Sequence, residues 1–398
     1  MVNQFIATRI FLIFFILVIS CFLGINGNEV YATDYYFNNY SGSDENPGTE
    51  ELPFKILQKV NDIYLKAGDY LFFASGTPYY GFAEINVERS EDNAGGYTNN
   101  PLIITSYGQG KAPRFTNPDF GNHHGNIFLI NSDHVLIRGL YFHDGPAVSQ
   151  GIKSADGVRK TGSVYIALDA EHITVRNCEF FNCPTGVFSY DEHCLITKNY
   201  FHDCSTWLQY LYWGAIAMFI ETSNHEISYN RIENYISWGG AFGADGGAIE
   251  LDGFEPKENI EIHHNLSLGN EGFLEFFDRE VDIRNVYVHH NIGEDYQQFI
   301  FMWHSRDVLI ENNTVLCLRP MNSKSRTVFV LRRGKVHNIT IRNNIFVTKD
   351  SLKVFGLGGM NPWPQDFNQV HTHNLFWSID GSTDNPQQQS AAGRRNNC

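Results

Sequence analysis

The segment IEIHHNLSLG, residues 260–269, recurs in altered form through the middle of the chain. Further copies are VLIRGLYFHD (135–144), ITVRNCEFFN (173–182), LITKNYFHDC (195–204), EISYNRIENY (226–235), VYVHHNIGED (286–295), VLIENNTVLC (308–317), ITIRNNIFVT (339–348) and the weaker VHTHNLFWSI (370–379). Apolar and polar residues alternate in each copy, which predicts a β-strand with one buried face. Because no copy can bury that face alone, we expect the copies to stack.

The spacing of the copies indicates the kind of stack. Equivalent positions in successive copies lie 21 to 38 residues apart, and no helical pattern separates them. These features predict a parallel β-solenoid whose coils each contribute two or three short strands. One repeat position holds Asn199, Asn230, Asn265, Asn291, Asn313, Asn344 and Asn374, with Leu140 and Cys178 in the first two copies. We expect this asparagine to adopt a left-handed turn and its side chains to hydrogen-bond along the stack.

Two cysteines share a repeat position in adjacent copies. Cys183 and Cys204 lie five residues after Cys178 and Asn199, respectively. Neighbouring strands are about 4.8 Å apart, which is within the Cα separation that a disulfide tolerates. A disulfide between adjacent coils and a buried pair of stacked free thiols are both compatible with this spacing.

With these repeats, the chain resembles the right-handed parallel β-helix proteins of the pectate lyase-like superfold, which are secreted carbohydrate-active proteins. The opening segment adds to the likeness through YYFNNYSGSDENPG (35–48), PFK (53–55), AGD (67–69) and LFF (71–73). In that family a helix closes the open end of the solenoid. The resemblance implies an N-terminal capping helix here, with one apolar face formed by Ile56, Leu57, Val60, Ile63 and Tyr64.

The resemblance indicates the fold rather than the reaction, since this fold hosts lyases, hydrolases, epimerases and adhesins. We expect an all-β, right-handed parallel β-helix over residues 33–379 and a polar, disordered tail over residues 380–398. The chain of 398 residues has 29 Lys+Arg and 44 Asp+Glu, a formal charge of −15. This acidity argues against nucleic acid or an anionic membrane as a partner. We expect a monomer that binds polysaccharide.

The N-terminus has the pattern of an export signal. Arg9 precedes an apolar run over residues 10–25, and the small-residue cleavage pattern VYA (30–32) follows. We expect residues 1–32 to be a signal peptide, so that the protein is secreted or periplasmic. A lipid anchor at Cys21 is the alternative, because VISC (18–21) resembles a lipoprotein processing box. No later segment is apolar enough to predict a spanning helix.

A second series of strands precedes the asparagine repeat and is expected to present an unusual outer face. If its apolar residues face the core, alternation directs outward Phe219, Glu250, Asp252, Glu275, Phe277, Phe301, Trp303 and Arg332. Carboxylates beside aromatic rings are typical of a carbohydrate cleft, where rings stack on sugars and acids act on the glycosidic bond. Candidate catalytic acids are Glu250, Asp252 and Glu275. Candidate sugar-binding rings are Phe219, Phe277 and Trp303.

The expected spacing of these acids leaves two geometries open. Glu250 and Glu275 would be strand neighbours about 5 Å apart, the separation found in retaining glycosidases. Two like charges so close raise one pKa, which keeps a proton on the acid. Asp252 would lie diagonally from Glu275 at about 7 to 8 Å, closer to the geometry of inverting enzymes. Calcium bound by the same carboxylates is a third use of the cluster.

Elimination on a uronic-acid polysaccharide is the rival reaction. It needs a base and a cation that neutralises the substrate carboxylate. The candidates are His304, Arg306 and Arg332 as catalytic groups and Arg333 as a substrate ligand, with Lys335 nearby. The sequence lacks the Asp-Asp and Gly-His-Gly motifs of polygalacturonases and the Trp-Ile-Asp-His and Arg-x-Pro-x-x-Arg motifs of classical pectate lyases.

Two other uses of the repeat stay open. A non-catalytic glycan-binding or adhesin solenoid is one, because repetition serves binding as well as catalysis. The pairs His263-His264 and His289-His290 recur one coil apart, but polar outward residues are routine in such strands, so we expect no metal there. The sequence favours a secreted glycoside hydrolase over a polysaccharide lyase and identifies no certain cofactor.

Overall fold

The computed structural model describes residues 32–87, 100–117, 125–145, 161–168, 170–206, 214–239, 243–277, 281–319, 327–332, 336–349, 353–358 and 370–381. In this part of the chain the strands form three parallel sheets and one antiparallel hairpin. The expected signal peptide, residues 1–32, and the expected tail, residues 380–398, lie almost wholly outside the described residues.

The three parallel sheets contain the following strands, in spatial order. Sheet 1 contains β1 (Asp34–Phe37), β2 (Tyr70–Ala74), β5 (Leu102–Tyr107), β8 (Val135–Arg138), β11 (Thr174–Arg176), β14 (Leu195–Thr197), β17 (Glu226–Ser228), β22 (Lys257–His263), β25 (Ile283–His289), β28 (Ser305–Glu311), β31 (Val336–Arg342) and β34 (Val370–Thr372). Sheet 2 contains β3 (Pro78–Tyr80), β6 (Arg114–Thr116), β9 (Tyr141–His143), β12 (Glu179–Phe181), β15 (Tyr200–Cys204), β18 (Arg231–Tyr235), β23 (Leu266–Leu268), β26 (Ile292–Glu294), β29 (Thr314–Cys317), β32 (Ile345–Thr348) and β35 (Leu375–Ser378). Sheet 3 contains β33 (Lys353–Gly358), β30 (Thr327–Arg332), β27 (Ile300–Met302), β24 (Leu274–Phe277), β21 (Gly247–Asp252), β16 (Ile216–Ile220), β13 (Thr185–Ser189), β10 (Val164–Ile166), β7 (Phe128–Ile130) and β4 (Ala83–Ile85). The hairpin pairs β19 (Ser237–Gly239) with β20 (Gly243–Asp245).

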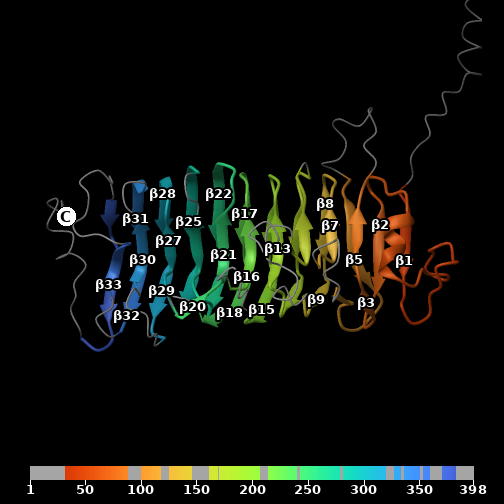
Figure 1. Cartoon of the computed structure of the whole chain (residues 1–398), viewed down its shortest axis with the longest axis horizontal. Helices are drawn as coiled ribbons and strands as arrows, with labels where there is room; N and C mark the ends of the chain where they lie inside the picture. The colour runs from red at the N-terminus through yellow and green to blue at the C-terminus, as the bar shows by residue number, and fades with distance from the viewer. Residues whose placement is uncertain are drawn as a thin grey trace, which may run out of the picture. The chain divides into compact units, whose positions relative to one another are not determined.

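Each coil visits the three sheets in turn. The chain runs through β17, β18 and β21, then through β22, β23 and β24, and each strand pairs in parallel with its counterpart one coil earlier. Figure 1 shows the coils stacked along one axis, from β1 and β2 in orange to β33 in blue. This confirms the expected all-β, right-handed parallel β-helix.

Strand alternation explains the register of the coils. In β22, Ile260 and Ile262 are buried and pair with Val286 and Val288 of β25, whereas Glu261 between them is exposed. A slip of one residue would place the isoleucines outside and the glutamate inside the core. The repeated apolar positions therefore fix which residues of successive coils lie side by side.

The repeated asparagines form a buried ladder of hydrogen bonds, as predicted. The Asn265 Nδ2 atom donates to the carbonyl of Ile227 at 2.8 Å and to Asn291 Oδ1 at 3.1 Å. Its Oδ1 atom accepts from the backbone N–H and from Nδ2 of Asn230, at 2.9 and 3.1 Å. The same pattern continues through Asn344. At the corner of each coil, some backbone N–H and C=O groups have no hydrogen-bond partner on a neighbouring strand. The asparagine side chains provide those partners.

The left-handed residue is not the ladder asparagine, so that part of the expectation is wrong. The residue directly before it has the positive φ, as at Tyr229 (56°), His264 (55°), His290 (55°), Asn312 (58°) and Asn343 (58°). The turn residue is at the surface at Tyr229, 51% exposed, while the following asparagine extends inward to the ladder. The residue before the asparagine therefore turns the chain, and the asparagine itself makes the hydrogen bonds of the ladder.

The stacked cysteines are free thiols, so the disulfide alternative is wrong. Cys183 and Cys204 are both fully buried and carry no disulfide. Burial raises the pKa of Cys183 to about 12 and that of Cys204 to about 11. Thiols are reactive as thiolates, so both groups are protected from oxidation and alkylation in the folded protein.

We expect iodoacetamide to leave Cys183 and Cys204 unmodified in the native protein and to modify both after denaturation without a reductant. Peptide mass spectrometry reads each site separately. If modification of the denatured protein needed a reductant, the pair would be a disulfide.

The segment expected to form a capping helix contains a short 3-10 helix, η1 (Leu57–Asp62). Leu57 and Val60 are buried, whereas Ile56 and Tyr64 are 41% and 58% exposed. The apolar face is therefore narrower than the sequence indicated, and closure of the open end by this helix stays a prediction. Among the described residues, no helix is long and apolar enough to cross a membrane.

Candidate active site

Two carboxylates lie side by side on the outer face of sheet 3. Glu250 of β21 pairs in register with Glu275 of β24, which confirms that they are strand neighbours. In the same row across the sheet, Phe219 pairs with Glu250 on one side and Phe301 pairs with Glu275 on the other. Both glutamates are half-buried. Because the core residues of these strands fix the register, the two acids are held as neighbours.

The two acids open onto a small pocket at the corner where the chain passes from sheet 2 to sheet 3. The pocket is lined by Ile216, Gly246, Gly247, Ile249, Glu250, Glu271, Gly272, Leu274, Glu275 and Gln298. Glu271 is only 6% exposed and accepts a 3.5 Å hydrogen bond from Gln298. Glu271 was not among the predicted site residues, because it lies in a turn outside the repeated strands. The only sign of Glu271 in the sequence was its position four residues before Glu275, as a second acid in an otherwise apolar segment.

Burial and neighbouring negative charges raise the pKa values of two pocket acids, Glu250 and Glu271. The pKa of Glu250 lies well above its usual value, first because of burial and then because of the charges of Asp252 and Glu275. The charges of Asp245 and Glu271 raise it further. Burial, followed by the charge of Glu275, also raises the pKa of Glu271 well above its usual value. Burial raises the pKa of Asp245 to about 6. Glu250 therefore holds its proton to a higher pH than an ordinary glutamate.

The hairpin β19–β20 carries an exposed ring beside this corner. Trp238 is 57% exposed, and its indole meets the ring of Tyr296 edge-on with centroids 5.0 Å apart. Tyr296 is tied to the pocket corner because its backbone N–H donates to the carbonyl of Asn270, next to Glu271. Gly246, with φ +105°, turns the chain from the hairpin into β21. Neither ring was among the predicted site residues, although a tryptophan beside a glycine-rich stretch was a usable signal.

Two residues expected on the exposed face are buried, so the expectation that they are accessible is wrong. Asp252 is 3% exposed and accepts the backbone N–H of Gly253 at 2.6 Å. Phe219 is fully buried and stacks on Phe188 at 4.8 Å, in a second apolar cluster with Ile216. Alternation directs a side chain out of the core but does not decide whether other side chains cover it. Neither residue is accessible to a sugar, and Asp252 enters the site only as one cause of the raised pKa of Glu250.

The other predicted aromatic and basic residues of sheet 3 are placed only in part. Trp303 is half-buried on the outer face, with its ring 6.2 Å from that of Phe301. Phe277 and Arg332 belong to β24 and β30, but their side chains lie outside the described residues, as does the whole of Arg333. Their roles stay predictions.

The basic residues proposed for elimination do not all share the face of the acids. Arg306 belongs to sheet 1, where its guanidinium pairs with Asp282 at 2.8 Å and Asp307 at 3.0 Å. These bonds raise the pKa of Arg306. His304 is half-buried at the corner between β27 and β28. The chain turns between the two residues, so neighbours in sequence lie on different sheets.

The paired histidines form a stacked cluster on the solenoid surface. The rings of His263 and His289 stack at 4.9 Å, and those of His264 and His290 at 5.0 Å. Within each pair the Nδ1 atoms are 2.8 Å apart, and His289 Nε2 lies 2.8 Å from Glu261. Each pair therefore has hydrogen-bond partners within the pair and on the preceding strand.

Metal binding by the pocket acids stays a prediction. Calcium takes carboxylate oxygens, so the donor type fits. Among the described residues, however, one group of three ligating side chains converges to within 4.8 Å, and it contains none of the pocket acids.

Comparisons with known proteins agree with the architecture. The family described as "Right handed beta helix region" matches residues 102–315. No curated protein matches the chain. A GH136 lacto-N-biosidase from Eubacterium ramulus superposes with a TM-score of 0.58 at 13% identity, covering 87% of this chain and 68% of that one.

Two further solved structures show the same fold. One, described as a glycoside hydrolase, has a TM-score of 0.58 at 10% identity over 92% of this chain and 99% of its own. A mutant tailspike protein of E. coli bacteriophage HK620, solved with a hexasaccharide, has a TM-score of 0.50 at 13% identity over 81% and 54%. The family match covers more than half of the chain, and the protein therefore belongs to the right-handed β-helix family.

Proposed function

We propose that the protein acts outside the cytoplasm as a glycoside hydrolase on a neutral polysaccharide, with Glu250 as the acid and Glu275 as the nucleophile. The observation that carries this proposal is the register pairing of the two glutamates at a pocket where burial and nearby charges raise the pKa of Glu250. The similarity to two sugar-cleaving enzymes and to a saccharide-bound tailspike supports a glycan as the ligand.

The geometry supports a retaining reaction. Residues paired on adjacent strands start from backbones about 4.8 Å apart, and retaining enzymes hold their carboxyl groups about 5 to 5.5 Å apart. Protonated Glu250 would give its proton to the glycosidic oxygen while the Glu275 carboxylate attacks the anomeric carbon. Water would then release the sugar from Glu275, with Glu250 taking the proton back. The inverting pair needed an accessible Asp252, which is buried.

The charge of the pocket supports a neutral substrate. Its described lining contains the acids Glu250, Glu271 and Glu275 and no lysine, arginine or histidine. A uronic-acid polymer would bring further negative charge to this corner, and elimination would need a cation to neutralise it. The ion pairs of Arg306 on sheet 1 leave that residue unsuited to this task.

We expect Trp238→Ala to raise KM about fivefold with little change in kcat, because the exposed indole would stack on a sugar ring and such contacts are worth about 1 kcal/mol. Trp377→Ala is the matched control, since Trp377 is also exposed, at 62%, but lies in β35 of sheet 2. Steady-state kinetics on a soluble oligosaccharide checks this. Equal effects of the two substitutions would remove Trp238 from the site.

We expect Glu271→Gln to move the alkaline limb of the pH–rate profile to lower pH. The negative charge of Glu271 helps to raise the pKa of Glu250, so its removal lets the acid lose its proton earlier as the pH rises. Glu84→Gln is the control, because Glu84 lies on β4 at the far end of the same sheet, where it accepts a hydrogen bond from Asn131 at 2.6 Å. An unchanged limb in Glu271→Gln would contradict the assignment of Glu250 as the acid.

The proposed reaction is tested by incubating the protein with a panel of neutral and uronic-acid polysaccharides. New reducing ends and the ultraviolet absorbance of an unsaturated uronic acid are recorded together. Reducing ends on a neutral glycan without that absorbance are expected. Both signals on a uronic-acid polymer would show elimination instead, and binding without cleavage of any polymer would show a glycan-binding solenoid.

A further inference from the structure

A left-handed position just before the sheet 1 strands, or near their start, changes its residue type along the solenoid. From His134 onward the described coils have a positive φ there: His134 (54°), His172 (62°), His193 (58°), Asn224 (64°), Asn259 (58°), Asn285 (53°), Asp307 (56°) and Asn338 (55°). Asparagine and aspartate suit this backbone conformation, and in these later coils their side chains hydrogen-bond to one another, as Asn259 does to Asn224 at 3.0 Å. Three consecutive early coils carry histidine instead, so their imidazoles stack.

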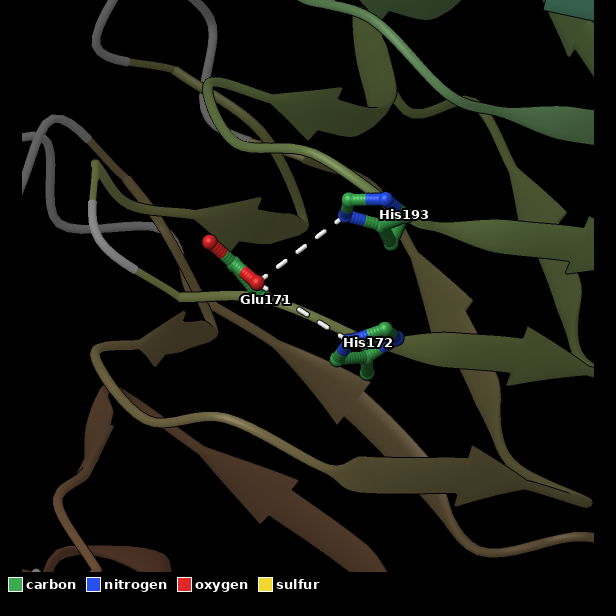
Figure 2. Close-up of side chains that lie close together, drawn as sticks. All are labelled: Glu171, His172 and His193. Atoms are coloured by element: carbon green, nitrogen blue, oxygen red, sulfur yellow. Dashed lines mark ion pairs between the residues drawn. The ribbon is translucent and has the colours of Figure 1, made fainter. Parts of the chain in front are cut away.

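The stacked imidazoles have a carboxylate beside them. The ring of His172 stacks on that of His134 at 4.6 Å and on that of His193 at 4.8 Å. Glu171 Oε2 lies 3.8 Å from His172 Nε2 and 3.9 Å from His193 Nδ1. Figure 2 shows this oxygen directed toward both rings, with Glu171 and His172 on one coil and His193 on the next. One ligating atom from each of Glu171, His172 and His193 lies within 4.8 Å of the others.

We propose that Glu171, His172 and His193 bind a divalent transition-metal ion of the Zn²⁺ class. Two imidazoles with one carboxylate are a donor set that suits zinc, whereas calcium and magnesium prefer oxygen ligands alone. Zinc bonds of about 2.0 to 2.1 Å place tetrahedral ligands about 3.4 Å apart. All three side chains are exposed, with 42 to 50% of the side-chain surface accessible, so small rotations bring the donors together and ions have free access.

The surroundings favour a cation at this position. Glu171 lines a larger pocket together with Asp191, Glu192 and Glu255, whose charges attract a metal ion. The two basic residues of that pocket are already engaged: Arg284 pairs with Glu258 and Asp282, and Lys257 donates to the carbonyl of Glu255.

His134 adds a third imidazole next to the site. Its backbone N–H donates to the carbonyl of Glu171 at 2.8 Å, which fixes the two coils against each other. A metal at Glu171, His172 and His193 would link two adjacent coils and leave a further coordination position for water.

The test measures Zn²⁺ binding to the metal-free protein, prepared without a histidine tag, by isothermal titration calorimetry. The site variants are His172→Asn and His193→Asn. Asparagine removes the imidazole yet keeps the left-handed turn, because asparagine holds the same position in later coils of this series. The control is His264→Asn combined with His290→Asn, where Asn312 and Asn343 hold the equivalent left-handed position one and two coils further on.

We expect one Zn²⁺ per chain in the wild type and in the control, and at least about tenfold weaker binding in each site variant. The thermal unfolding temperature of the wild type should rise on adding Zn²⁺, and that rise should be lost in the site variants. Wild-type affinity in both site variants would overturn the proposal. Loss of binding in the control alone would also overturn it and assign the metal to the paired histidines.

Discussion

The Glu250→Gln variant is expected to lose hydrolytic activity by about 100- to 10,000-fold in kcat, which is the contribution of a general acid placed in hydrogen-bond contact with the leaving group. Glutamine keeps the size of the side chain, so binding of the substrate should change little. Initial rates and a separate binding titration with an oligosaccharide check the two parts of this prediction.

The same variant should unfold at a temperature equal to or above that of the wild type at neutral pH. Burial and four neighbouring carboxylates disfavour the charged form of Glu250, so a neutral amide removes that penalty. Higher stability with lost activity is the pattern of a residue retained for function.

A matched control is Glu179→Gln. Glu179 also lies on the surface of a strand, β12, but on sheet 2, where it contacts His202 at 3.2 Å. Its replacement should leave kcat unchanged. Activity of Glu250→Gln close to that of Glu179→Gln would contradict the role given to Glu250.

The Asn265→Ala variant is expected to lower the free energy of unfolding by about 2 to 5 kcal/mol. Asn265 is 1% exposed, and its side chain takes part in four hydrogen bonds of the ladder. Alanine leaves the carbonyl of Ile227 and the backbone N–H of Asn230 buried without these partners. Each such group costs about 1 to 3 kcal/mol.

The control for the ladder is Asn374→Ala. Asn374 donates to Ile341 and accepts from Asn344 in the same way, but it is only half-buried and lies in the last described coil. In Asn374→Ala, water can reach the backbone groups that lose their hydrogen-bond partner. The loss in free energy of unfolding should therefore be clearly smaller than in Asn265→Ala. Urea unfolding followed by circular dichroism compares the two variants, and equal losses would contradict the stabilising role given to the ladder.

The fold was predictable because it depends on a short-range pattern that recurs. Alternation fixes which side of each strand faces the core, and the ladder position aligns the coils. The register of Glu250 with Glu275 followed from these two features alone, because a strand shifted by one residue would bury its charges.

The site was predictable only where it lies on the strands. Asp252 and Phe219 have the outward orientation but are covered, and coverage depends on packing that alternation does not encode. Glu271 lies in a turn and Trp238 in a hairpin between sheets, and neither belongs to the repeat. Arg306 was grouped with the acids through closeness in sequence, but the corner after β27 carries it to sheet 1.

The most direct test of the proposed hydrolysis at Glu250 and Glu275 analyses products by mass spectrometry after reaction in water labelled with oxygen-18. Wild type and Glu250→Gln are compared on the glycan that the wild type cleaves. Hydrolysis predicts wild-type products that carry one labelled oxygen at the new reducing end, and at most traces from the variant. Unlabelled products lighter by one water molecule, or equal labelling by the variant, would contradict it.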